Sequence, residues 1–262
     1  YNDENLKSNI QLSKITNCSA KKKVVGKGAE PPEPFVLIYN TDINTNKNKP
    51  TTFIVIKVEL PFKCNPEEFK KIYQDEYKNK ITHRFIRNEL GLSEGIRLKL
   101  NGTFGRWLYF LDEDDRLYKT RYLIQTALWD NPVTGKKTYV SIFPNFIKQY
   151  CQPSLHLLEH ISRHTGKGED ILRHINDPEG LVNCEDRFVR TMKRLQIDCS
   201  KANYPALLNS RYTEIYNIPV TVSSCNILPR RYPWMYSLVT TAVQYFGKYK
   251  GVLSLVNTVI LL

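Results

Sequence analysis

Short apolar runs separated by polar loops predict strands in the first half of the chain. Residues 35–39 (FVLIY) and 53–60 (FIVIKVEL) are rich in β-branched and aromatic side chains, and the polar stretch NTDINTNKNKPT joins them. Runs bounded in this way by Asn, Lys and Pro are typical of strands. Similar runs predict further strands at 96–100, 105–111, 121–129 and 138–143, with a tight turn at Asn101-Gly102 and another at 130–135.

A different pattern interrupts these strands between Pro66 and Leu90. Apolar residues recur there at three- and four-residue steps among lysines and glutamates, at Phe69, Ile72, Tyr73, Tyr77, Ile81, Phe85 and Ile86. This spacing places them on one face of a helix. We therefore expect a helical insertion that packs this face against the sheet.

The second half of the chain follows the helical period. Ser154 stands where a helix cap is expected, at the start of a helix that runs through His164. A shorter helix at 169–175 and a third at 184–197 follow, joined by the turns TGKG and NDPEGLVN, and this order is compatible with a helix-turn-helix. Beyond them we expect helices at 204–216 and 234–245, an extended piece at 219–224, and a buried helix or strand in the C-terminal stretch GVLSLVNTVILL.

Together these patterns predict an α+β fold in three parts. Residues 1–34 carry the run Lys21-Lys22-Lys23 and several prolines with no periodic apolar pattern, which predicts a flexible basic arm. Residues 35–150 are expected to form a small β-rich module with the helical insertion. Residues 151–262 are expected to form a helical domain with a helix-turn-helix-like unit.

The charge balance changes the picture from a fold to a class of partner. The 262-residue chain has a formal net charge of +12, so it attracts polyanions. Nucleic acid is the first partner to expect, with double-stranded DNA foremost. The alternative is that the excess lysines reflect compositional bias and only solvate the surface. No signal peptide is visible and the apolar C-terminal stretch is short of the roughly 20 residues that span a bilayer, so we expect no membrane partner and a cytoplasmic location.

The helix at 184–197 carries the most informative basic pattern. Its cations Arg187, Arg190, Lys193 and Arg194 lie on the side away from the apolar Phe188, Met192 and Leu195. Such a helix can enter a major groove, with Arg reading base edges and Lys holding phosphates, although a solvated helix face is the alternative. Basic residues among aromatics or near the turns complete the nucleic-acid-binding set: Arg116, Lys119, Arg121, Arg163, Lys167, Arg230 and Arg231.

Three residue patterns bear on metal and catalytic chemistry. His156, His160 and His164 align along one side of a helix, where two could bind a metal or all could be ordinary helix-face residues. The acids at 112–115 could join a two-metal site or form a polar turn. The six cysteines include no C-x-x-C pair, and no phosphate-binding loop, dinucleotide fingerprint or nucleophile elbow is present. We therefore expect no metal, no cofactor and no self-sufficient enzyme, and we assign no catalytic residue.

The segment YVSIFPNFIKQYCQPSLHLLEHI at 139–161 resembles part of bacterial insertion-sequence transposase-like proteins. The match rests on Phe143-Pro144-Asn145-Phe146-Ile147, Tyr150 and Ser154-Leu155, and with the strand leading to Cys64 it covers about residues 53 to 197. In that family a zinc ribbon precedes a helix-turn-helix. Four thiolates are needed to hold zinc in such a ribbon, and only Cys64 stands at a ligand-like place. The resemblance therefore implies a degenerate ribbon without metal.

The function expected from these observations is DNA binding on behalf of a mobile genetic element, without catalysis. One alternative is a metal-dependent transposase or nuclease fragment that uses some of Asp112, Asp114, Asp115, Glu169 and Asp170. The other is a non-enzymatic assembly subunit that binds another protein, or a second copy of itself, through aromatics such as Trp107, Trp129 and Trp234.

Overall fold

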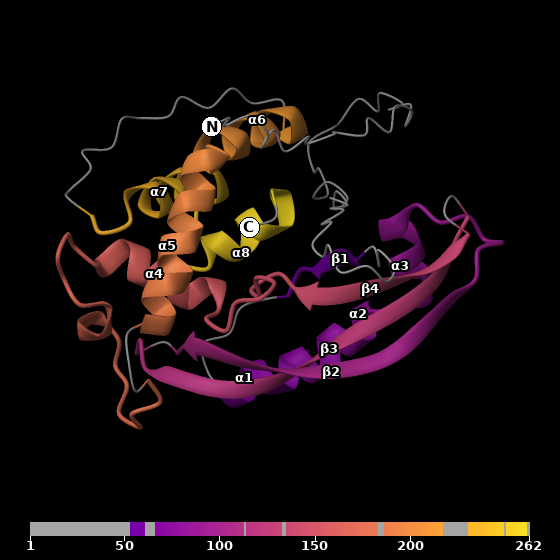
Figure 1. Cartoon of the computed structure of the whole chain (residues 1–262), viewed down its shortest axis with the longest axis horizontal. Coiled ribbons are helices and arrows are strands. Elements are labelled where there is room, and N and C mark those ends of the chain that lie inside the picture. Colours follow the sequence, from indigo (N-terminus) through magenta and orange to yellow (C-terminus); the bar gives the residue numbers. More distant parts are fainter. Residues whose placement is uncertain are drawn as a thin grey trace, which may run out of the picture. The chain divides into compact units, whose positions relative to one another are not determined.

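A four-stranded sheet forms the first half of the described molecule (Figure 1). The computed structural model describes residues 53–60, 66–112, 114–132, 135–182, 186–216, 230–248 and 250–260. The arm expected at 1–34, the strand at 35–39 and the extended piece at 219–224 lie outside these ranges. The strands are β1 (Phe53–Val58), β2 (Leu98–Leu111), β3 (Leu117–Asn131) and β4 (Lys136–Pro144), in the order β1-β4-β3-β2.

The strand pairing combines two antiparallel hairpins with one parallel contact. β2 pairs with β3 and β3 with β4 in antiparallel fashion, while β1 lies parallel to β4 with Lys57 opposite Phe143. A parallel partner needs a long crossover. Here the helical insertion and the β2–β3 hairpin lie between β1 and β4 in the chain, so residues more than eighty positions apart become neighbours.

The turn predicted at Asn101-Gly102 is wrong. These residues lie inside β2, and the register with β3 shifts between Leu100 and Thr103. Gly102 has φ +83°, and a glycine with positive φ serves a β-bulge as readily as a turn. The two strands expected at 96–100 and 105–111 are therefore one long bent strand.

The helical insertion covers one face of the sheet but is not a single helix. It consists of α1 (Pro66–Ile72), the π-helical turn η1 (Tyr73–Tyr77), α2 (Lys78–Lys80) and α3 (His83–Leu90). The break falls before Thr82, whose hydroxyl accepts a hydrogen bond from the Phe85 backbone N–H at 3.0 Å and so caps a new helix. The predicted apolar face does pack on the sheet, where Tyr73, Tyr77, Ile81 and Ile86 join its core.

Two tyrosines of η1 form hydrogen bonds with backbone groups of the sheet at the point where β3 and β4 separate. The Tyr77 hydroxyl donates to the Ile142 carbonyl and accepts from the Gln125 N–H at 2.8 Å, so it bridges a ladder position. The Tyr73 hydroxyl donates to the Leu123 carbonyl. Beyond this point β3 continues with β2 alone, as a two-stranded ribbon.

The second half consists mostly of packed helices, as predicted. They are α4 (Leu155–His164), the 3-10 turn η2 (Ile171–His174), α5 (Asp186–Lys201), α6 (Tyr204–Tyr216), α7 (Pro233–Phe246) and α8 (Val252–Val259). The Ser154 hydroxyl accepts from the Leu157 N–H and caps α4, which confirms the expected helix start. Helix α7 is central, because α4, α5, α6 and α8 all contact it.

The middle helix of the expected helix-turn-helix is only one 3-10 turn. The Asp170 carboxylate caps η2 by accepting from the Leu172 N–H at 2.8 Å, and extended backbone at Ile175 ends it after four residues. Helices α4 and α5 are each packed on α7. In the described residues, α4 and α5 are therefore joined without an intervening α-helix.

The β2–β3 ribbon lies between two hydrophobic cores. Leu108 and Phe110 belong to the core under the helical insertion, whereas Tyr109 and Leu111 belong to the core of the C-terminal helices. Successive side chains of a strand point to opposite faces, and here both faces are covered. All described residues fall within one compact unit, and the fold class is mixed α+β, as the sequence predicted.

The C-terminal apolar stretch forms α8, whose Val252, Leu253 and Val256 are fully buried in the helical core. This confirms the expected buried helix or strand as a helix. None of the helices within the described ranges is long and apolar enough to cross a membrane.

Candidate functional site

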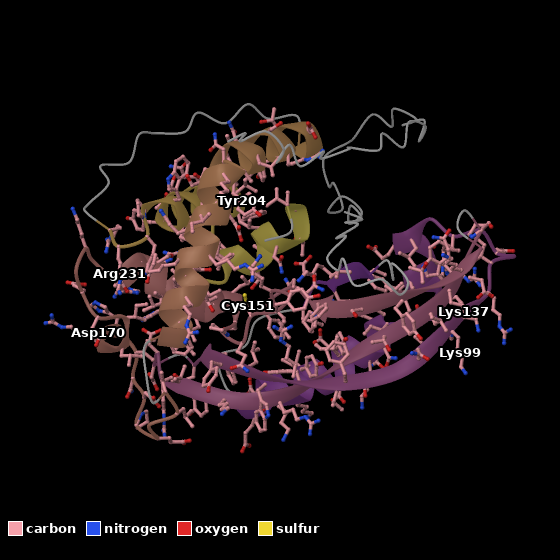
Figure 2. The ribbon with its side chains drawn as sticks, in the orientation of Figure 1. Lys99, Lys137, Cys151, Asp170, Tyr204 and Arg231 are labelled. Carbon is pink, nitrogen blue, oxygen red and sulfur yellow. The ribbon has the colours of Figure 1, made fainter. Side chains whose placement is uncertain are left out.

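Four cations gather where the sheet meets the helices. They come from separate elements: Lys57 from β1, Arg106 from β2, Lys148 from the loop after β4, and Arg194 from α5. Each of them acts electrostatically on the Cys151 thiol. Figure 2 shows Cys151 at this junction, between the sheet and the C-terminal helices. We call these four side chains the junction cluster.

Lys57 is the innermost cation that the sheet contributes. It is partly buried, its Nζ donates to the Ile147 carbonyl at 2.5 Å, and it lies 5.3 Å from the centre of the Phe143 ring. Burial, together with the neighbouring positive charges of Lys148 and Arg106, lowers the Lys57 pKa to about 7. Near neutral pH this ammonium therefore gives up its proton easily unless an anion lies beside it.

Arg106 faces the same aromatic ring and fixes the loop after β4. Its guanidinium lies 5.8 Å from the Phe143 ring centre and its Nη2 donates to the Cys151 carbonyl at 2.5 Å. Burial lowers the Arg106 pKa, but an arginine stays protonated in a protein. Arg106 is therefore a permanent charge in the junction cluster.

Among the described residues, the positive charge of the junction cluster has no carboxylate paired with it, because none lies within ion-pair distance of any of the four cations. Asp198 raises the Lys148 pKa at longer range, but burial lowers that pKa more strongly. Partly buried charges without a counter-charge are costly in a folded protein, so the arrangement favours an anionic ligand.

The Cys151 thiol does not supply the missing negative charge. Burial raises its pKa, and this outweighs the opposing effect of the surrounding cations. A thiol with a raised pKa stays protonated and unreactive near neutral pH. We therefore regard Cys151 as a packing residue at the centre of the cluster rather than a nucleophile.

The outer face of α5 extends the positive surface away from the junction. Arg190, Lys193 and Arg194 are exposed on it, opposite the buried Phe188, Met192 and Leu195, as the sequence predicted for this helix. The side chain of Arg187 lies outside the described residues. Arg194 belongs to both the predicted helix face and the junction cluster.

Several other predicted binding residues are engaged within the protein. Arg163 forms an ion pair at 3.1 Å with the buried carboxylate of Glu159, and Arg231 donates to the Glu169 carbonyl. Arg116 lies 3.7 Å from the Glu179 carboxylate and 5.6 Å from the Tyr118 ring, while Arg230 lies 4.7 Å from the Tyr236 ring. These four residues therefore have structural partners in addition to any ligand.

The remaining predicted residues are exposed and do not join the cluster's contacts. Lys119 lies 5.4 Å from the ring centres of both Trp107 and Tyr109 on the ribbon. The Arg121 guanidinium lies against Gly105, in the space where another residue would have its Cβ. Lys167 is exposed in the turn after α4.

Sequence reasoning missed Lys57, Arg106 and Lys148. One signal was present: Lys57 interrupts the otherwise apolar run FIVIKV, which suggests a charge held inside a strand. Their convergence depends on the parallel β1–β4 pairing and on the packing of α5, and neither is readable from a single sequence.

The histidines and acids that suggested metal chemistry serve other contacts. His156 is buried and its pKa is lowered to about 3 by that burial; His160 bonds to the His174 carbonyl at 2.7 Å and approaches Asp115 at 3.4 Å. The Asp112 carboxylate accepts from two backbone N–H groups and forms a polar turn. No group of three or more metal-ligating side chains occurs among the residues that the structure describes.

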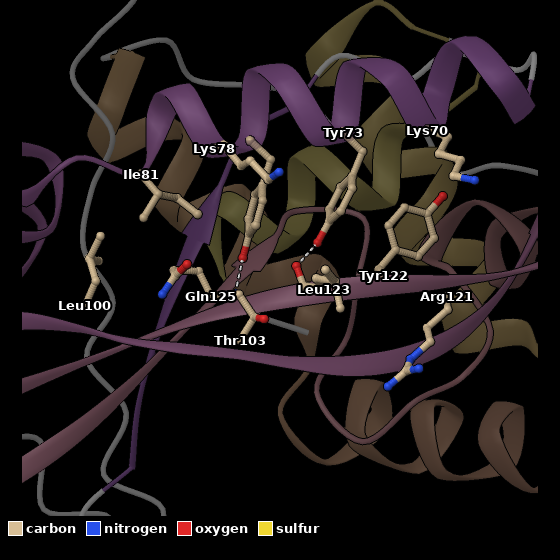
Figure 3. A pocket seen from close by; sticks show the side chains of 11 residues that line it. Lys70, Tyr73, Lys78, Ile81, Leu100, Thr103, Arg121, Tyr122, Leu123 and Gln125 are labelled. Atoms are coloured by element: carbon tan, nitrogen blue, oxygen red, sulfur yellow. Dashed lines mark hydrogen bonds between the residues drawn. The ribbon is translucent and has the colours of Figure 1, made fainter.

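A cavity of about 290 Å³ lies beneath η1, where β3 leaves β4 (Figure 3). Tyr73, Tyr77 and Tyr122 form its aromatic wall, and Lys70 and Lys78 stand at its edge. Its tyrosine hydroxyls at 73 and 77 are bound to backbone groups of the sheet. These two tyrosines, which line the cavity, therefore attach the helical insertion to the strands.

Comparison with protein-family models, with curated proteins and with solved structures gave no match. The site must therefore be interpreted from its own geometry.

Proposed function

We propose that this protein binds nucleic acid by holding backbone phosphates at the junction cluster and along the exposed face of α5. One observation carries the proposal: two strands, one loop and one helix each bring a cation to the junction cluster. Among the described residues, no carboxylate is paired with any of the four. Lysine and arginine side chains supply the phosphate contacts that dominate nucleic-acid affinity.

A polyanionic ligand accounts for more of the positive surface than a single small anion does. Arg190 and Lys193 continue the positive charge along α5, and the chain as a whole has a net charge of +12. A ligand with phosphates at regular spacing can contact the cluster and the helix at once. The proposed link to a mobile genetic element rests on the sequence resemblance alone, and base reading by α5 in a major groove stays a prediction.

Fluorescence anisotropy with single-stranded DNA, duplex DNA and RNA, each over a range of salt concentrations, tests the proposal. We expect binding that weakens steeply with salt, since each neutralised phosphate adds roughly 0.7 to 0.9 to the slope of log affinity against log salt. The double variant Lys148→Ala with Arg194→Ala should reduce that slope by about 2.

A matched control separates the site from the overall charge. Lys99 and Lys137 are exposed at the opposite end of the sheet (Figure 2), so Lys99→Ala with Lys137→Ala removes the same charge elsewhere. We expect this control to leave the salt slope close to that of the wild type. Equal losses in the two double variants, or no binding to any of the three nucleic acids at low salt, would rule the proposal out.

A further inference from the structure

We propose that the junction site binds an unpaired nucleobase together with its phosphate, with the base stacked on Tyr150. The ligand class is therefore single-stranded or locally unpaired nucleic acid rather than an intact duplex. The inference rests on the proposed function and adds the aromatic half of the site.

Tyr150 presents its ring to solvent beside the junction cluster. It is 75% exposed, compared with 50% for Trp107 and 42% for Tyr139, so little of its surface is used in packing. Scattered exposed aromatics need no explanation, but this one directly precedes Cys151 and follows Lys148 by two residues. A single short segment thus provides a ring and a cation next to each other.

The backbone holds Tyr150 in a conformation that side-chain-bearing residues rarely adopt. Its φ is +61°, in the left-handed region, where glycine is the usual occupant. Contacts on both sides maintain it: the Cys151 N–H donates to the Lys148 carbonyl at 3.2 Å, and Arg106 donates to the Cys151 carbonyl. Residues kept in such a conformation are frequent at ligand contacts.

The backbone joins the ring to the charges. Tyr150 directly precedes Cys151, whose carbonyl accepts from the Arg106 guanidinium at 2.5 Å, and Arg106 lies near the same Phe143 ring as Lys57. A phosphate held by the cluster therefore leaves its neighbouring base near the Tyr150 ring. In a duplex the faces of the bases are occupied by stacking within the helix, so only an unpaired base can use this ring.

Aromatic rings beside a cationic groove are the usual means of binding single strands, because every base has a face that can stack. This combination distinguishes the junction from the outer face of α5. There Arg190 and Lys193 are exposed, whereas Phe188, the aromatic residue of α5, is buried.

The test compares a short single-stranded DNA with an abasic strand of the same length, for the wild type and for Tyr150→Ala, Tyr150→Phe and Tyr139→Ala. We expect the wild type to bind the base-bearing strand about 5- to 150-fold more tightly than the abasic one. Tyr150→Ala should lose that preference while keeping its affinity for the abasic strand. Tyr150→Phe and Tyr139→Ala should retain the preference.

The outcomes separate this inference from the proposed function. If the wild type binds both strands equally well with a steep salt dependence, the stacking inference is wrong and phosphate binding stands. If Tyr150→Ala keeps the preference for the base-bearing strand, stacking on this ring is likewise excluded. If the wild type binds neither strand at low salt, the stacking inference is wrong, and the proposed function then depends on binding of duplex DNA or RNA in the anisotropy test above. The wild-type comparison does not depend on how well any variant folds.

Discussion

Lys57 shows how one residue can hold a charge that no carboxylate pairs with in the described part of the chain. Its ammonium has the Ile147 carbonyl and the face of the Phe143 ring as neighbours, and Lys148 and Arg106 add positive charge nearby. A carbonyl and a ring only partly replace the water that a lysine loses on burial. The result is a pKa of about 7 instead of the ordinary 10.5.

This pKa predicts that affinity for nucleic acid falls as pH rises through about 7. A bound phosphate favours the protonated Lys57, so binding is coupled to proton uptake, and the loss between pH 6 and pH 8 should approach tenfold. Phosphodiesters do not titrate in this range. Anisotropy at fixed ionic strength measures the effect, and Lys57→Arg, which stays charged, should flatten the pH profile.

The lowered pKa of Lys57 also determines how pH changes the stability of the folded protein. Between pH 7 and 10.5 the unfolded chain holds a proton on Lys57 that the folded chain has lost, so the free energy of unfolding contributed by this group rises with pH. An affinity that changes equally with pH in the wild type and in Lys57→Arg would contradict the role given to Lys57.

At the level of single residues, the sequence predicted Arg194 and the cations of α5 but not the cations of the sheet and its loop. The helical period alone shows which α5 residues point away from the core. Lys57 and Lys148 are far apart in the chain and become neighbours only through β1–β4 pairing. Long-range pairing leaves no local signal, which is why the site was only partly predictable.

Among the elements, those defined by local periodicity were predicted best. Helix α6 has the expected bounds, and α4 begins at the expected cap. The insertion was expected as one helix because Ile81 continues the apolar stripe, yet the Thr82 cap starts a new helix. Capping by a side chain competes with helix continuation, and the spacing of apolar residues does not show where this happens.

The contact between η1 and the sheet yields a prediction about stability. Tyr77→Phe removes the hydroxyl that bridges Gln125 and Ile142 and leaves the buried Ile142 carbonyl and the partly buried Gln125 N–H without this partner, so the free energy of unfolding should fall by about 1–3 kcal/mol. Urea denaturation measures it. Tyr118→Phe is the control, because the Tyr118 ring packs on Phe110, and its change should stay within about 0.5 kcal/mol. Equal stability of the Tyr77 variant and the wild type would exclude the bridge.

On the scale of the whole molecule, the sheet and the helices are joined by buried polar contacts as well as by the shared ribbon. The fully buried Asn257 of α8 donates to the Asn145 carbonyl at 2.6 Å. The Asn145 N–H donates to the Val58 carbonyl, and its side-chain oxygen accepts from the Leu60 N–H. Helix α8 is thereby connected to the end of β1.

Asn257→Ala should therefore weaken both halves together. We expect the free energy of unfolding to fall by about 1–3 kcal/mol, because the Asn145 carbonyl loses its buried donor. Amide hydrogen exchange should show faster exchange in β1 and β4 as well as in the C-terminal helices. The neighbouring Thr258→Ala, which removes only a local bond to the Leu255 carbonyl, is the control. Faster exchange confined to α8 would show that the two halves unfold independently.

The ribbon between the two cores also limits how the chain can be divided. Tyr109 donates its N–H to the Gln152 carbonyl and Leu117 donates to the Asn176 carbonyl, so both edges of the ribbon are held by segments from beyond residue 150. A fragment that ends near residue 150 would expose the apolar side chains of Tyr109, Leu111 and Leu117 to solvent and leave both strand edges unpaired. Exposed apolar surface and unpaired strand edges promote aggregation. A stable shorter version of this protein should therefore keep the ribbon together with the segments at Gln152 and Asn176 that hold its edges.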